Sequence, residues 1–234
     1  MVTQFSRRAI LAHIGAAGVS AALPVRAIAQ NAYAELEGRP WFFLTDDEAR
    51  YLAAVTDIFI PEDEFPSASQ AGVVDFIDLQ LAGPYGRGAG LYMQGPFREG
   101  EPTQGYQAEH VPAALIRRGI AETDQADGGL KLVDRDAEGR RAFVGSLSQS
   151  EDVFQSAFYE ELLKLANWGY FADPIYGGNK NYAGWEMVGF PGAHAYYTSF
   201  VDDHNRPFDM PPKGIAHVPG QGPAQFLRTN GREG

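Results

Sequence analysis

Residues 148–165, SQSEDVFQSAFYEELLKL, decide the fold of this chain because they contain its clearest helical pattern. Apolar residues recur there at helical spacing and make one broad stripe. The stripe consists of Phe154, Phe158, Leu162 and Leu165. Ser148 and Glu151 have the spacing of a capping box, in which each side chain accepts the other residue's main-chain N–H. We therefore predict a helix that starts at this box and turns its stripe into the core.

Three further helices are predicted from similar signals. Thr45 and Glu48 form a second capping box at the start of one helix. Residues 71–81 form another, and Pro112 suits the first turn of a third. The charged residues within 130–142 indicate a solvated connection with a short helix.

The segments between these helices are rich in glycine, proline and aromatic residues. Residues 83–110 and 167–193 are long and irregular, and several prolines extend the chain after residue 201. No stretch alternates as a strand does, and no internal repeat is visible. The sequence thus predicts a mainly α fold: a small helical domain with long Gly/Pro/aromatic-rich loops and an extended C-terminal arm.

The first thirty residues carry the marks of a twin-arginine export signal. Two adjacent arginines precede an uncharged apolar run, and an A-x-A processing site follows it. The signal residues are Ser6, Arg7, Arg8, Ile10 and Leu11, and the cleavage site is Ala27 with Ala29. A membrane anchor is the alternative, but the run is shorter than the roughly 20 apolar residues that span a bilayer.

Cleavage after Ala29 would divide the chain into three parts. We predict a signal peptide over residues 1–29, a helical domain over 30–200 and an extended tail over 201–234. Twin-arginine export carries folded proteins, which indicates that something must be assembled before export.

Composition excludes several classes of function. The formal net charge is −11, which opposes contact with phosphate backbones, so we expect no nucleic-acid partner. Cysteine is absent, so this chain has no disulfide, no thiolate-bound iron–sulfur cluster and no C-x-x-C-H haem attachment. Any redox cofactor near it is therefore expected in another chain.

No motif for a hydrolase, a zinc protease or a nucleotide-binding loop occurs in the sequence, so we predict no catalytic, cofactor-binding or metal residues. Acidic residues nevertheless leave an alternative open. Asp202-Asp203-His204 is the one acid–histidine cluster, and Asp173 precedes Pro174 at a turn. A free-standing exported enzyme, or a metal- or sugar-binding protein, would use Asp173, Asp202 and His204.

Two other acidic groups are read as solvated. One is a turn between prolines that contains Glu62, Asp63 and Glu64. Carboxylates at such close spacing can bind calcium, but the glycine-bearing loop of an EF-hand is missing. Asp75 and Asp78 fall on the more polar side of the helix over residues 71–81, where we expect them to face water.

Short motifs along the chain resemble the gluconate 2-dehydrogenase subunit 3 family, the small subunit of membrane-bound flavin-dependent sugar and sugar-acid dehydrogenases. The resemblance covers roughly residues 40–200. Together with Ser6-Arg7-Arg8, the matching residues are Leu44-Thr45 with Glu48, Ile60-Pro61 with Asp63, Gly72-Val73, Ile77-Asp78, Leu81-Ala82-Gly83, Gly95-Pro96, Gln104-Gly105-Tyr106, Gly169, Phe171-Ala172-Asp173-Pro174, Ile175-Tyr176-Gly177-Gly178-Asn179, Gly184-Trp185 and Gly189-Phe190-Pro191-Gly192.

This resemblance implies a role in a complex. In that family a large subunit with FAD oxidises the sugar or sugar acid, and a multihaem cytochrome c subunit with haem c passes the electrons to the membrane. The small subunit holds no cofactor; it binds the large subunit, helps it mature and provides its export signal. The chain is accordingly expected in the periplasm, attached peripherally to the cytoplasmic membrane through the complex and exported by the twin-arginine machinery.

The resemblance also suggests where the partner binds. Aromatic residues often anchor interfaces, so we expect the two aromatic loops to meet the large subunit. The predicted interface residues are Tyr106, Phe171, Asp173, Pro174, Tyr176, Gly177, Gly178, Asn179 and Trp185.

Overall fold

The computed structural model describes residues 33–97, 109–124, 130–193, 202, 204 and 211–215. This part of the chain is mainly helical and contains no named strand, which confirms the predicted fold class. Its elements are η1 (Ala34–Leu36), α2 (Asp46–Phe59), α3 (Val73–Ala82), α4 (Pro112–Thr123), η3 (Leu132–Asp134), α5 (Ala137–Ser148), α6 (Val153–Phe171), η4 (Pro174–Tyr176), η5 (Lys180–Tyr182) and α7 (Ala183–Met187).

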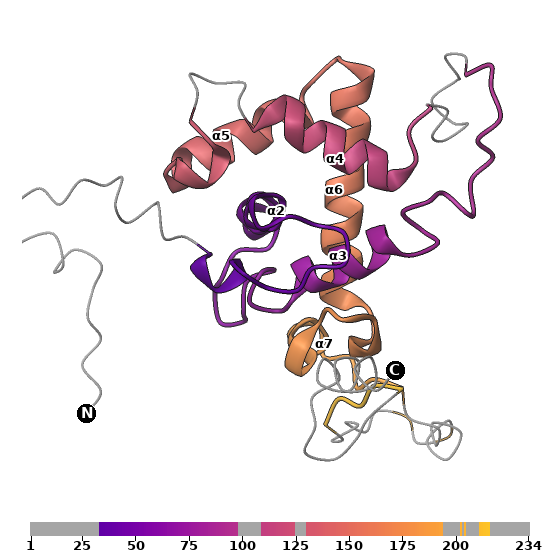
Figure 1. Ribbon diagram of the computed structural model, residues 1–234. Coiled ribbons are helices and arrows are strands. Elements are labelled where there is room, and N and C mark those ends of the chain that lie inside the picture. Colours follow the sequence, from indigo (N-terminus) through magenta and orange to yellow (C-terminus); the bar gives the residue numbers. More distant parts are fainter. Residues whose placement is uncertain are drawn as a thin grey trace, which may run out of the picture.

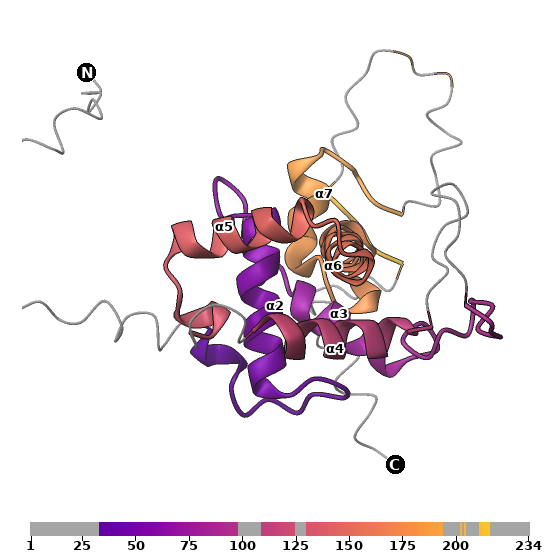
Figure 2. The ribbon, with the colours of Figure 1, turned by 90° about the horizontal axis from the view of Figure 1, so that it is seen from above.

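Helix α6 is the centre of the fold. It contacts α2, α3, α4, α5 and α7. In Figure 1 it stands upright, with α4 across its upper part, α5 at the upper left, α3 across its lower part and α7 at its lower end. Figure 2 shows α6 end-on with the other helices around it. The stretch with the clearest apolar stripe is therefore the element on which the remaining helices pack.

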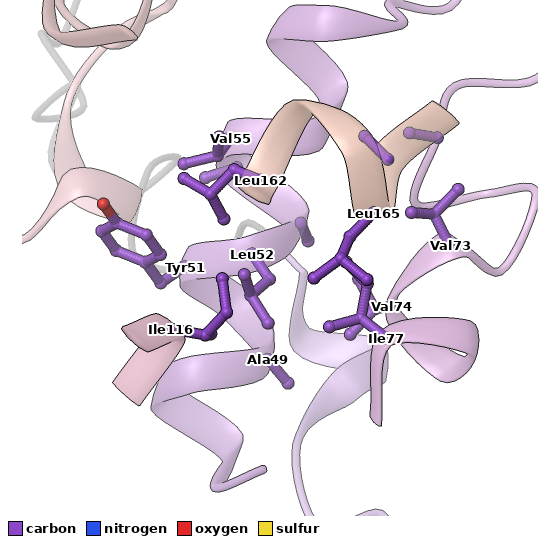
Figure 3. Packing of buried hydrophobic residues seen from close by; sticks show 14 of the residues in the cluster. Ala49, Tyr51, Leu52, Val55, Val73, Val74, Ile77, Ile116, Leu162 and Leu165 are labelled. Atoms are coloured by element: carbon purple, nitrogen blue, oxygen red, sulfur yellow. The ribbon is translucent and has the colours of Figure 1, made fainter. Parts of the chain in front are cut away.

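The core forms where α2, α3 and α4 meet this stripe. Phe158, Leu162 and Leu165 are fully buried, while Phe154 is half-buried near the start of the helix. In Figure 3, apolar side chains from these helices converge on one cluster, among them Leu52 of α2. Burial of so many large side chains stabilises the domain, since each contributes about 1.5–3 kcal/mol.

The predicted capping boxes had different outcomes. Thr45 caps α2 as predicted: its hydroxyl accepts the Glu48 N–H at 3.2 Å, and the Glu48 carboxylate accepts the Thr45 N–H at 2.8 Å. The box at Ser148 is wrong, because Ser148 is the last residue of α5. Helix α6 begins after Asp152, whose carboxylate accepts the Gln155 N–H at 2.8 Å. The negative charge of an aspartate at this position is also stabilised by the positive end of the helix dipole.

The solvated connection predicted over residues 130–142 is wrong in its first part. Leu132 and Val133 of η3 are buried against the core. The Leu132 N–H donates to the Asp124 carboxylate at 2.9 Å, which fixes the chain as it leaves α4. Two adjacent apolar residues were enough to draw this charged segment inward, and α5 follows it as a full helix.

None of the described helices is both long enough and apolar enough to cross a membrane. The predicted export signal, residues 1–29, lies outside the described residues, as does Tyr106.

Candidate functional site

The candidate site is the motif loop, defined here as residues 172–193, which follows α6 and contains η4, η5 and α7. It folds back onto the end of α6, with α7 beside that end in Figure 1. Two glycines permit this close approach. A Cβ atom on Gly178 would lie 2.1 Å from the Gly169 carbonyl oxygen, and one on Gly184 would lie 2.1 Å from that of Tyr170. No larger residue fits either position without moving the main chain.

Side chains of the motif loop also satisfy the last carbonyl groups of α6, which have no partner within the helix. The Trp185 indole N–H donates to the Phe171 carbonyl at 2.8 Å. Asn179 is fully buried: its amide donates to the Ala172 carbonyl at 2.9 Å and its oxygen accepts the Gly184 N–H at 2.8 Å. The polar groups of this loop thus stabilise the C-terminal end of the central helix.

Helix α3 holds the motif loop from a second side. Asp75 accepts from both Arg39 and Lys180, and so joins the segment before α2 to η5. The Lys180 N–H also donates to the Ala71 carbonyl at 2.9 Å. A carboxylate between two cations is well compensated for its partial burial.

Asp78, one turn along α3, is buried and binds the segment that leads into α2. Its carboxylate accepts the main-chain N–H groups of Phe42, Phe43 and Leu44 at 2.9, 2.8 and 2.9 Å. The predicted solvated face for Asp75 and Asp78 is therefore wrong. Residues 39–44 cover this side of α3, and their main chain and Arg39 supply the partners that water would otherwise provide.

Asp173 is occupied by the main chain. One carboxylate oxygen accepts the Ile175 N–H at 3.0 Å, and the other accepts the Ile215 N–H at 2.8 Å. Asp202 and His204 are exposed, and no cluster of three or more metal-ligating side chains occurs among the residues that the structure describes. In the acidic turn, Glu62 pairs with Gln70 and Asp63 accepts the Phe65 N–H at 2.8 Å. Each of these two acids is thus engaged in a local turn contact.

The predicted interface residues divide by exposure. Tyr176 is 52% exposed, while Phe171 and Asp173 are half-buried. The remaining described members are buried inside this chain: Pro174, Gly177, Gly178, Asn179 and Trp185. Those five shape the loop from within, so a direct contact with a partner stays a prediction chiefly for Tyr176.

Other exposed apolar residues lie on the same loop or are hydrogen-bonded to it, and they were not predicted. Phe190 packs edge-on against Trp185 and still exposes 45% of its surface. Met187 and Val188 at the end of α7 are exposed, and so is Ile215, which bonds to Asp173. We define the apolar face as Tyr176, Met187, Val188, Phe190 and Ile215. Only their position next to Gly184-Trp185 could have indicated them, because an irregular stretch has no helical or strand periodicity from which burial can be predicted.

A second aromatic group lies on α6 itself. Trp168 is 46% exposed and meets the Tyr85 ring edge-on, with the Lys164 ammonium over both rings. The buried Glu161 accepts from the Tyr85 hydroxyl and pairs with Lys164. Burial raises the pKa of Tyr85 above its usual value, and the hydrogen bond to Glu161 adds a smaller effect in the same direction. These contacts anchor the loop after α3 to the central helix.

A model of the family described as gluconate 2-dehydrogenase subunit 3 matches residues 46–192. The chain belongs to the gluconate 2-dehydrogenase subunit 3 family. The match runs from the first residue of α2 to Gly192, so the subunit 3 region includes both the helical body and the motif loop. No curated protein and no solved structure gave a significant match. A subunit 3 is one part of a multi-subunit dehydrogenase, so membership of this family implies partner subunits.

Proposed function

We propose that this chain is the non-catalytic small subunit of a periplasmic, flavin-dependent sugar or sugar-acid dehydrogenase complex. It binds and stabilises the FAD-bearing large subunit and supplies the twin-arginine export signal. One observation carries the proposal: in a chain of the subunit 3 family, the polar side chains of the motif loop form hydrogen bonds within this chain. Asp173, Asn179 and Trp185 all bond to this chain's own main chain, as positioning groups do.

The apolar face is the surface that we assign to the large subunit. Its residues are exposed, yet the loop that carries four of them is held to α6 and α3 by part-buried hydrogen bonds and close glycine contacts. A surface that is already ordered loses little conformational entropy on binding, and aromatic anchors dominate such interfaces. The redox cofactors, FAD and haem c, belong to the large subunit and to a multihaem cytochrome c subunit in this proposal.

Tyr176→Ala tests this surface. We expect a loss of affinity for the large subunit of about 30-fold, the effect of removing an anchor worth about 2 kcal/mol. The domain itself should keep its stability because half of the Tyr176 surface is already in water. Val153→Ala is the matched control, since Val153 is 70% exposed at the other end of α6. Equal affinity of both variants and the unchanged subunit, measured by titration with the large subunit, would refute the assignment.

Arg7→Lys together with Arg8→Lys tests the export role. We expect the large subunit to remain in the cytoplasm, because twin-arginine recognition depends on the paired arginines. Arg26→Lys changes an arginine outside the pair and should leave export unchanged. The measurement is the amount of large subunit in periplasmic and cytoplasmic fractions. Normal periplasmic levels with the doubly substituted signal would contradict the escort role.

The rival function is a free-standing exported enzyme or a metal- or sugar-binding protein that uses Asp173, Asp202 and His204. It predicts that the purified chain alone turns over a sugar, or binds a metal or flavin. Our proposal predicts neither activity nor flavin absorbance for the chain alone, and both for the assembled complex. Sugar oxidation by the isolated chain would overturn the proposal.

A further inference from the structure

A short C-terminal segment, residues 211–215, lies on the motif loop and is hydrogen-bonded to it. The Lys213 N–H donates to the Pro191 carbonyl at 3.2 Å, and the Lys213 carbonyl accepts the Ala193 N–H at 2.6 Å. These two bonds make a parallel bridge between Lys213 and Gly192. We call residues 211–215 the clasp.

The next two residues of the clasp bond to side chains from other parts of the loop. The Gly214 N–H donates to the Tyr182 hydroxyl at 3.1 Å, and the Ile215 N–H donates to the Asp173 carboxylate at 2.8 Å. The clasp therefore binds the start of the motif loop at Asp173, its middle at Tyr182 and its end near Gly192. Three points that are far apart along the loop are tied together by three consecutive residues.

Glycines on both sides fit the two segments closely. Gly192 has a φ of +89°, and a Cβ atom there would lie 2.3 Å from the Lys213 carbonyl oxygen. A Cβ atom on Gly214 would lie 3.0 Å from the Asp173 carboxylate oxygen. The loop is thus shaped to receive this segment, because an ordinary side chain at Gly192 would push the main chains apart.

We propose that the motif loop is a receptor for this chain's own C-terminal segment, and that the bound clasp completes the apolar face by adding Ile215 to the four residues that the loop carries. Asp173 is then a positioning residue that orders the loop through its bond to Ile215. Ile215, which is 69% exposed, is brought beside the loop by this closure and becomes part of the apolar face.

This inference has a consequence that rests on the proposed function. The clasp, residues 211–215, follows both the export signal and the helical domain in the sequence. The surface for the large subunit would therefore be complete only after residue 215 has been made. An incomplete small subunit would carry the signal without a finished binding face.

Hydrogen exchange on the full mature chain tests the clasp directly. Gly192→Ala places a methyl group against Lys213, and Asp173→Asn removes one of the two acceptor oxygens. We expect each change to speed exchange of the main-chain N–H groups of Lys213, Gly214 and Ile215 by about tenfold, the effect of losing one hydrogen bond of this segment. Far-UV circular dichroism should show that the helices of both variants persist.

Gly189→Ala is the matched control. Gly189 also has a positive φ, of +66°, but a Cβ atom there meets nothing within 4 Å. It reproduces the main-chain strain of Gly192→Ala without the contact to Lys213, so exchange in residues 211–215 should change less than about twofold. The clasp is overturned if Gly192→Ala and Asp173→Asn exchange there as the unchanged chain does, or if Gly189→Ala matches Gly192→Ala.

Titration with the large subunit tests the consequence separately. Gly192→Ala should weaken binding by at least about tenfold relative to Gly189→Ala, because Ile215 is no longer held beside the rest of the apolar face. Equal affinities would overturn the link between the clasp and the face. If the unchanged chain binds no large subunit, the proposed function fails, whereas the clasp itself is still decided by hydrogen exchange.

Discussion

Replacing Asp78 by alanine should destabilise the domain more than any other single change to a polar residue in α3. The Asp78 carboxylate is 3% exposed and accepts three main-chain N–H groups, those of Phe42, Phe43 and Leu44, at 2.8–2.9 Å. It holds the segment that leads into α2 against α3. Without it, the buried Leu44 N–H loses its acceptor, while water can reach the exposed Phe42.

The magnitude follows from these three bonds. A hydrogen bond to a charged group contributes about 1.5–3 kcal/mol, but contributions of bonds that share one acceptor are not additive. Since water replaces part of the loss near Phe42, we expect Asp78→Ala to lower the free energy of unfolding by about 3–5 kcal/mol. Asp78→Asn should cost only about 1–2 kcal/mol, because one oxygen accepts both Phe43 and Leu44 and an asparagine oxygen can keep that role.

Urea unfolding followed by far-UV circular dichroism measures these differences. Asp47→Ala is the matched control, since Asp47 is 64% exposed and pairs with Lys131 on the surface. An exposed pair of this kind contributes about 0–1 kcal/mol. The reasoning is refuted if Asp78→Ala falls within about 1 kcal/mol of the unchanged domain, or if Asp78→Asn is as damaging as Asp78→Ala.

Three further outcomes are expected from the core. Phe158→Ala should lower the free energy of unfolding by about 3–5 kcal/mol in urea. The methyl group of Gly119→Ala would lie 2.2 Å from the Phe158 ring, so this change should lower the free energy of unfolding less in the Phe158→Ala variant than in the unchanged domain. Gly178→Ala should lower the free energy of unfolding by about 2–3 kcal/mol and should change the fluorescence emission of Trp185 as the motif loop leaves α6. An unchanged spectrum would contradict the contact with Gly169. Burial raises the pKa of Tyr51 above its usual value, so the unfolded state releases that proton first. Stability should fall above about pH 10, and Tyr51→Phe should reduce the slope by about 1.4 kcal/mol per pH unit, the share of one such group.

Local patterns predicted the parts of this fold that depend on neighbouring residues. The stripe of α6, the capping box at Thr45 and Pro112 at the start of α4 all follow from contacts within about one turn of helix. The same logic failed at Ser148 because two helices compete for that residue. The capping signal was present, but α5 extends through Ser148 and leaves Asp152 as the cap of α6.

Contacts between distant segments decided the rest. Asp78 lies on the polar side of its helix and would face water if residues 42–44 did not cover it. Trp185 and Asn179 have the composition of an interface, yet their partners are carbonyl groups at the end of α6. No spacing in the sequence distinguishes a polar side chain that bonds its own main chain from one that awaits another protein.

The sequence by itself therefore determined the helical class, the central helix and the family motifs, because each is set by residue type and short spacing. Only the tertiary structure decided which motif residues are buried, where the apolar face lies and that residues 211–215 bind the motif loop. The physical reason is that a hydrogen bond or a close glycine contact between segments far apart in sequence depends on three-dimensional position, and no local periodicity encodes that position.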